Sequence, residues 1–201
     1  MNIYVETNFV LEFVFEQEQF SSCEQILEVC QGGRANLIIP AYSLTEPNEK
    51  LIRQTRSRKE LYRKLEDELK QLARTASYQP RIDNIKNVLS LLVDSSDEEQ
   101  ERFVECRNKF LASVEIIPLT AEIIHLAATY EVPYDLQPQD ALVYASIITH
   151  LRQNLPVIAC FLNRNYKDFD IPIITNDLNR FNCRMIPRFD DGYNFIQSRL
   201  R

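Results

Sequence analysis

Short apolar runs alternate along this chain with longer stretches in which apolar residues recur every three to four positions. The short runs are typical of buried strands, and the longer spacing is typical of amphipathic helices. Strands that alternate with helices predict an α/β fold of three layers, α/β/α, with a central parallel sheet covered on both faces. The expected strands are 3–5, 35–39, 114–118, 157–161 and 183–186, and the expected helices are 8–17, 21–31, 43 onward, 120–130, 138–151, 173–181 and 192–200.

The region between the second and third expected strands has a different pattern. It contains no convincing strand, and Leu61, Leu65, Leu69 and Leu72 recur at helical spacing. The acidic run 94–99 is expected to break the helices of this region with a turn. We therefore predict a single domain over 1–201 that carries a helical insertion over about 50–112.

Composition narrows the class of protein. The chain has 201 residues, of which 45% are hydrophobic, and this is enough for one sizeable core. It has no run of eighteen apolar residues, and an acid lies within its first apolar stretch, so we expect neither a membrane span nor a signal peptide. Five cysteines without a CxxC pair predict buried thiols and a cytoplasmic location.

The charges are unevenly distributed around a net charge of −6. Residues 1–33 contain six acids and no base, whereas residues 50–74 contain nine bases and four acids. An acidic body with one basic helical stretch could bind phosphates locally, although a solvated helix face would look the same. The candidate RNA contacts are Arg53, Arg56, Arg58 and Lys59.

Three acids lie where a parallel sheet places its ligands. Glu6 follows the first strand directly, and Glu46 and Asp140 lie near the starts of two helices. With only two histidines, a zinc site is improbable, and oxygen ligands point to Mg²⁺ or Mn²⁺. Each acid alone could equally cap a helix or complement its dipole.

Four segments in order resemble the motifs of PIN domains. Val5-Glu6-Thr7-Asn8 is similar to the acid-Thr-Asn opening, in the Glu-Thr-Asn form of one PIN-like subfamily that also carries a helical insertion. The second, third and fourth motifs resemble 40–46, 139–146 and 161–169, the last of these ending in Asp-Phe.

The resemblance implies divalent-metal-dependent phosphodiester hydrolysis, usually of RNA, with Mg²⁺ or Mn²⁺ as the cofactor. Glu6, Glu46 and Asp140 would form the anionic core, completed by Asn165 as a metal ligand or by Asp168 as a further catalytic acid. Thr7 or Asn8 would orient a ligand or contact the phosphate.

Three functions stay open, and one departure from the family pattern supports the third. At the fourth motif the residue nearest the usual acid is Asn165, which brings no negative charge. The first hypothesis is a PIN-domain ribonuclease. The second is the toxin of a VapC-type toxin–antitoxin pair, masked by a small antitoxin protein. The third is a non-catalytic PIN-like scaffold that binds RNA or protein. Family resemblance also implies a possible homodimer.

Overall fold

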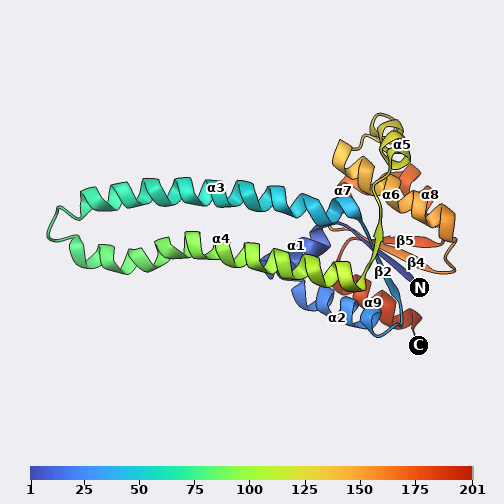
Figure 1. Cartoon of the computed structure of the whole chain (residues 1–201), viewed down its shortest axis with the longest axis horizontal. Helices are drawn as coiled ribbons and strands as arrows, with labels where there is room; N and C mark the ends of the chain where they lie inside the picture. The colour runs from blue at the N-terminus through green and yellow to red at the C-terminus, as the bar shows by residue number, and fades with distance from the viewer. Residues whose placement is uncertain (201) are drawn as a thin grey trace.

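The strands of the molecule form one parallel sheet (Figure 1). The computed structural model describes the backbone of residues 1–200 and their side chains, except those at positions 80, 83, 84, 86, 87 and 166. Within this part, five strands lie in the order β3-β2-β1-β4-β5, and every pairing is parallel. The strands are β1 (Asn2–Val5), β2 (Asn36–Pro40), β3 (Glu115–Ile117), β4 (Ala159–Leu162) and β5 (Cys183–Ile186).

Helices cover both faces of the sheet and give two hydrophobic cores, because successive strand residues point to opposite faces. Ile3 and Val5 enter one core and Tyr4 enters the other. The first core packs against α1 (Thr7–Phe15), α2 (Phe20–Gln31), the end of α4 (Gln79–Ser113) and α9 (Phe189–Arg199). The second packs against α5 (Ala121–Glu131), α6 (Pro138–Asn154), the short α7 (Tyr166–Phe169) and α8 (Pro172–Asn179). The predicted three-layer fold is confirmed.

Two long antiparallel helices project from the sheet (Figure 1). Helix α3 (Ala41–Leu72) has 32 residues and α4 has 35, so each is about 50 Å long. Their roots pack against α1, and their outer parts contact one another well beyond the body. We call this pair the hairpin.

The hairpin corrects one sequence prediction. The acidic run 94–99 does not break the helices, since α4 passes through it without interruption. The turn between the two helices lies instead at residues 73–78. Ser96 and Glu99 face α3, where the guanidinium of Arg58 donates to the Glu99 carboxylate over 2.7 and 3.0 Å. This contact between the helices stabilises the helical conformation where local composition favours a turn.

In residues 1–200, no helix combines the length and apolarity needed to span a bilayer. The predicted thiols are free, and Cys23, Cys106, Cys160 and Cys183 are buried, while Cys30 is partly buried.

Candidate metal and nucleic-acid site

The candidate site lies where the strand order reverses. β1 has β2 on one side and β4 on the other, and parallel sheets bind ligands at the carboxyl ends of strands around such a switch point. A cavity of 370 Å³ opens there. Its lining comes from the start of α1, the first turns of α3 and α6, and the segment after β4, and comprises Glu6, Thr7, Asn8, Leu11, Tyr42, Glu46, Glu49, Lys50, Arg53, Gln139, Asp140 and Asn165.

Glu6 caps α1 with one carboxylate oxygen and leaves the other unpaired. Its Oε2 accepts a hydrogen bond of 2.8 Å from the backbone N–H of Asn8, while its buried Oε1 has no partner. The pKa of the Glu6 carboxyl is raised to about 7, chiefly by burial and in smaller part by the charges of Glu46 and Asp140, while the Asn8 hydrogen bonds lower it. An unpaired buried carboxylate oxygen is costly unless a proton or a cation compensates it.

Glu46, which also lines the cavity, is oriented by α1. The Thr7 hydroxyl donates to its Oε2, which joins the first turn of α1 to the second turn of α3. Thr7 therefore orients a neighbouring acid. The position of Glu46 follows from the strand-to-helix turn after β2, since Pro40 ends the strand and Ala41 begins α3 directly.

Asp140 lies in the first turn of α6, after Pro138 at the start of the helix, as predicted. The Asn165 side-chain amide donates to its Oδ1 over 3.4 Å. Burial raises the pKa of the Asp140 carboxyl to about 6; the charges of Asp168 and Glu46 also raise it, whereas the Asn165 bond lowers it. Repulsion among these acids means that a cation placed between them would be strongly favoured.

The donors in this cavity fit a hard divalent cation that keeps part of its water shell. Carboxylate and amide oxygens are the ligands of Mg²⁺ and Mn²⁺, and Mg²⁺ is often bound by one or two carboxylates with waters completing the shell. The unpaired Oε1 of Glu6 is the observation that supports this fit. Across the part of the chain that the structure describes, no three His, Cys, Asp or Glu side chains are close enough to hold an ion as a group. A cation would therefore contact some of these acids through water.

The other predicted residues are placed differently. Asp168 lies on α7, exposed and outside the cavity lining, and acts on Asp140 through its charge. Asn8 and Asn165 line the cavity. Arg58, expected to contact RNA, instead forms the bidentate pair with Glu99 between α3 and α4, so its guanidinium is committed to holding the hairpin together.

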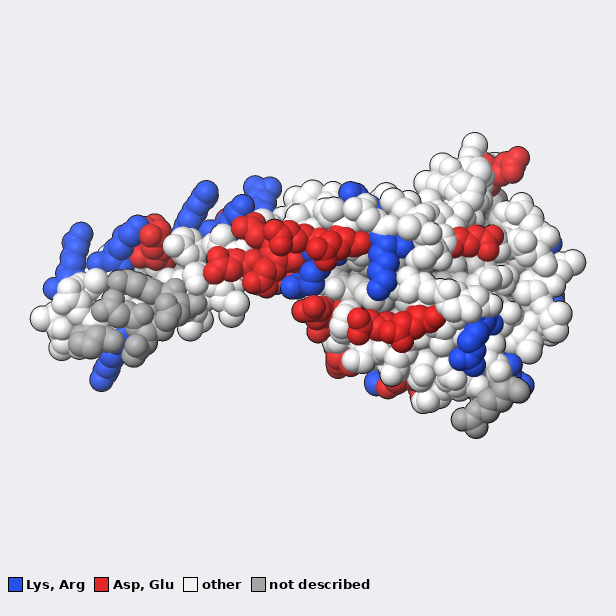
Figure 2. Space-filling view, turned by 60° about the horizontal axis from the view of Figure 1, so that its bottom comes forward, with Lys and Arg blue, Asp and Glu red and all other residues white. Residues whose placement is uncertain are grey.

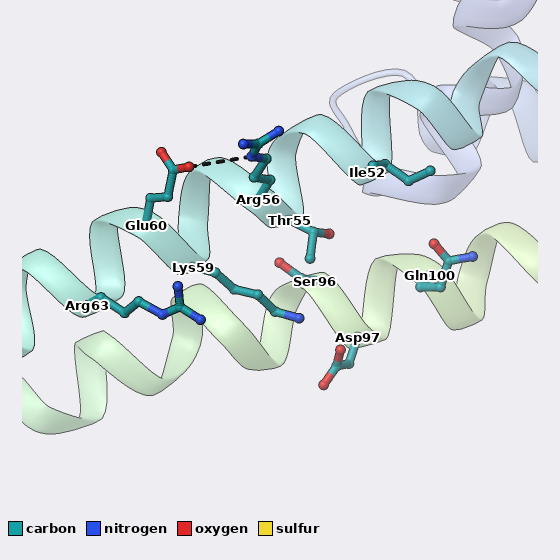
Figure 3. A pocket seen from close by; sticks show the side chains of 9 residues that line it. All are labelled: Ile52, Thr55, Arg56, Lys59, Glu60, Arg63, Ser96, Asp97 and Gln100. Atoms are coloured by element: carbon teal, nitrogen blue, oxygen red, sulfur yellow. Dashed lines mark ion pairs between the residues drawn. The ribbon is translucent and has the colours of Figure 1, made fainter.

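Basic residues continue outward from the acidic cavity along α3. Lys50 and Arg53 line the cavity itself, with the Lys50 nitrogen 5.4 Å from the centroid of the Phe15 ring. Further along, α3 and α4 enclose a second hollow of 530 Å³, which we call the groove (Figure 3). It is lined by Ile52, Thr55, Arg56, Lys59, Glu60, Arg63, Ser96, Asp97 and Gln100, and Arg56 also contacts Glu60 at 3.5 Å.

Sequence reasoning missed the anchor of the segment after β4. Glu12 of α1 is fully buried; one of its oxygens is bound by Arg164, and the other accepts from the Gln19 backbone N–H at 3.0 Å. Arg164 directly precedes Asn165, so this ion pair positions the fourth-motif segment at the cavity. Glu12 and Arg164 are 152 residues apart, and no local pattern signals their pairing.

The comparison with protein families agrees with the fold and the geometry. A family model described as PIN domain matches residues 3–169, and the chain belongs to that family. PIN domains are typically metal-dependent nucleases. None of the curated proteins compared with the chain matches it.

Proposed function

We propose that this protein is a divalent-metal-dependent ribonuclease whose centre is the cavity formed by Glu6, Glu46 and Asp140. The observation that supports the proposal is the buried, unpaired Oε1 of Glu6, whose pKa is raised together with that of Asp140. Such an arrangement is costly in the absence of a cation and becomes favourable when one binds. Membership of the PIN family independently favours nuclease chemistry.

Each side chain has a distinct part in this mechanism. Glu6 and Asp140 would hold Mg²⁺ or Mn²⁺, with Glu46 bound through water in the orientation that Thr7 imposes. When bound, the cation supplies a water of lowered pKa and neutralises charge on the phosphoryl oxygens. Asn165 keeps Asp140 in place by donating to its Oδ1.

Substrate binding would rely on the cations around the acids. Lys50 and Arg53 lie on the cavity wall, where they can bind phosphates that flank the scissile bond. Arg56, Lys59 and Arg63 extend this positive charge into the groove. A chain of net charge −6 repels RNA overall, so these residues would direct its approach.

The first experiment is cleavage of RNA with Mn²⁺, with chelator and with the Asp140→Asn variant, accompanied by thermal melts of metal-free protein. We expect chelator or Asp140→Asn to reduce cleavage by at least about 100-fold, as expected when stabilisation of the transition-state charge is removed. Mn²⁺ at about a hundred times its dissociation constant should stabilise wild type by about 2.7 kcal/mol. Glu122→Gln, which changes an acid in the first turn of α5, is the matched control and should leave both results unchanged.

A specific observation favours a second candidate, a non-catalytic PIN-like scaffold that binds RNA. Asn165 stands where the fourth acid is expected and uses its amide as a donor toward Asp140, so it brings no charge to the site. This candidate predicts RNA binding with no cleavage and no Mn²⁺-dependent stabilisation. The same melts and assays therefore decide between the two. The toxin hypothesis, with an antitoxin as partner, stays a prediction.

A further inference from the structure

The fourth motif leaves the candidate metal centre one negative charge short. Asn165 stands where the fourth acid is expected, and its side-chain amide donates to Asp140 Oδ1 over 3.4 Å. An amide brings no charge, and the affinity of a site for a divalent cation depends on how many charged ligands surround it. A further acid elsewhere in the cavity would compensate for this missing charge.

The cavity has such an acid in Glu49. The lining includes four carboxylates, and Glu49 is the one among them that lies outside the four family motifs, since the second motif ends at Glu46. Nothing in the sequence around Glu49 distinguishes it from the other acids of a charged helix. Its place at the cavity becomes visible only when α3 is folded against α1 and α6.

The helical repeat of α3 turns Glu49 toward the same cavity as Glu46. Residues three or four positions apart share one face of a helix. Glu49 and Lys50 follow Glu46 by three and four positions, Arg53 follows it by seven, and all four line the cavity. The Cβ atoms of residues three positions apart are about 5–6 Å from one another. The carboxylates of Glu46 and Glu49 can therefore both contact the water shell of one cation.

The neighbouring cations do not neutralise Glu49. Among the residues that the structure describes, Glu49 forms no ion pair, and the Lys50 nitrogen lies 5.4 Å from the centroid of the Phe15 ring. Burial raises the pKa of the Tyr42 phenol to about 12, and the charges of Glu46, Glu49 and Asp140 also raise it. Glu49 thus acts on the same side chain of the cavity as two of the candidate metal ligands.

An exposed acid is not by itself evidence of a site. On the face shown in Figure 2, acidic side chains also gather over the inner part of the hairpin. Glu49 differs from an ordinary surface acid because it lines the cavity in which the buried Oε1 of Glu6 has no partner. That unpaired oxygen is an independent indication that a cation binds in this cavity.

We propose that Glu49 is the fourth acid of the metal centre, where it supplies the charge that Asn165 lacks and acts on the cation through bound water. The inference rests on the proposed function, because it assigns a further residue to the same centre. In the described part of the chain, no three His, Cys, Asp or Glu side chains are close enough to hold an ion as a group, which fits an acid that acts through water. Residues that act on a metal through an intermediate group commonly change its affinity by about 10- to 100-fold.

Isothermal titration calorimetry of the metal-free full chain with Mn²⁺ tests the role of Glu49 without an activity assay. The titration is done at pH 8, above the raised pKa values of Glu6 and Asp140. Glu49→Gln should raise the Mn²⁺ dissociation constant by about 10- to 100-fold. Circular dichroism checks that each variant is folded.

The matched control is Glu68→Gln, which removes the same charge from an exposed position on the same helix. Glu68 lies about 28 Å further along α3 than Glu49. This distance exceeds the Debye length of about 10 Å at 0.1 M ionic strength, so the control should leave the Mn²⁺ dissociation constant unchanged.

A second variant tests whether Glu49 takes the place of the fourth acid. Asn165→Asp returns a carboxylate to the fourth motif, and by itself it should lower the Mn²⁺ dissociation constant. Combined with Glu49→Gln, it should restore most of the affinity that Glu49→Gln loses, because the number of acids at the cavity returns to four.

The outcomes separate this inference from the proposed function. Equal dissociation constants for Glu49→Gln and Glu68→Gln, with binding lost in Asp140→Asn, would overturn the role of Glu49 and leave the proposed metal centre intact. A loss of affinity in Glu49→Gln that Asn165→Asp does not restore would overturn its role as the substitute for the fourth acid. A wild type that binds no Mn²⁺ would overturn both the inference and the metal-dependent function.

Discussion

At the scale of single residues, Glu6 connects the fold to the chemistry. The same residue directly follows β1, caps α1 through Oε2 and presents an unpaired Oε1 at the cavity. A helix cap needs only one of the two oxygens. The structural and functional roles that the sequence left as alternatives for this acid are thus compatible, because they use different atoms.

Glu6 also predicts how the metal-free protein responds to pH. Its pKa is raised from 4.5 to about 7 in the folded state, so the native protein holds a proton that the unfolded chain has released. The free energy of unfolding should therefore fall as pH rises from about 4.5 to about 7, by on the order of 3 kcal/mol from this group. Asp140 acts in the same direction, since its pKa is raised to about 6.

Urea unfolding of chelator-treated protein across this pH range measures the effect. Glu6→Gln should remove about half of the pH dependence, and Glu6→Gln with Asp140→Asn should nearly abolish it. Excess Mn²⁺ competes with the protons, so it should stabilise wild type more at pH 8 than at pH 5. An unchanged slope in Glu6→Gln would contradict the burial of a proton at this carboxyl.

At the scale of elements, the strands were predictable because short apolar runs carry their own signal, and Cys183–Ile186 was predicted to the residue. The helical conformation of the acidic run 94–99 was not predictable, because Ser and Asp favour turns locally, whereas the Arg58–Glu99 pair that favours the helix forms only across the hairpin. The candidate acids were predictable in the same way as the strands. Each of Glu6, Glu46 and Asp140 lies next to a strand end or a helix start that the sequence marks.

The segment after β4 is held by an interaction between elements that the sequence does not reveal. The fully buried Glu12 of α1 is paired with Arg164, whose side chain is 31% exposed. Removing one partner of a buried pair leaves an uncompensated charge and costs about 3–5 kcal/mol, whereas replacing both with apolar residues is often close to neutral. We expect Arg164→Leu to destabilise the protein by that amount and Glu12→Leu with Arg164→Leu to recover most of it.

Chemical denaturation of the four members of this double-mutant cycle measures the coupling. Arg180→Leu is the control, since it removes an arginine that is 75% exposed from its pair with Asp177, and it should cost less than about 1 kcal/mol. Additive effects of Glu12→Leu and Arg164→Leu would show that the buried pair does not form.

At the scale of the whole molecule, the hairpin carries basic side chains outward from the acidic cavity. The root of α3 lines the cavity, and the groove presents Arg56, Lys59 and Arg63. Arg53 is about 15 Å along α3 from Arg63, so a nucleic-acid strand that enters the cavity can reach the groove without leaving the helix. In a chain of net charge −6, these cations form one track along α3, and the proposed function predicts that this track binds the phosphates of the substrate.

The contribution of the groove to kcat/KM should therefore depend on the length of the RNA substrate. Arg56→Glu with Lys59→Glu should lower kcat/KM for a long RNA by at least about tenfold, because binding weakens with every phosphate that the protein no longer neutralises. For an oligonucleotide that fits within the cavity, the same variant should retain most of the wild-type kcat/KM.

RNA binding can be measured with Asp140→Asn as the non-cleaving background. The slope of log affinity against log salt concentration should become shallower by about 0.7 for each phosphate that the groove variant leaves unbound. The control variant, Arg34→Glu with Arg184→Glu, makes the same charge change at exposed positions outside the groove. Any effect of this variant on kcat/KM should be the same for the long and the short substrate. If the groove variant weakens both substrates to the same degree, the positive charge acts by general attraction of RNA and the track along α3 is wrong.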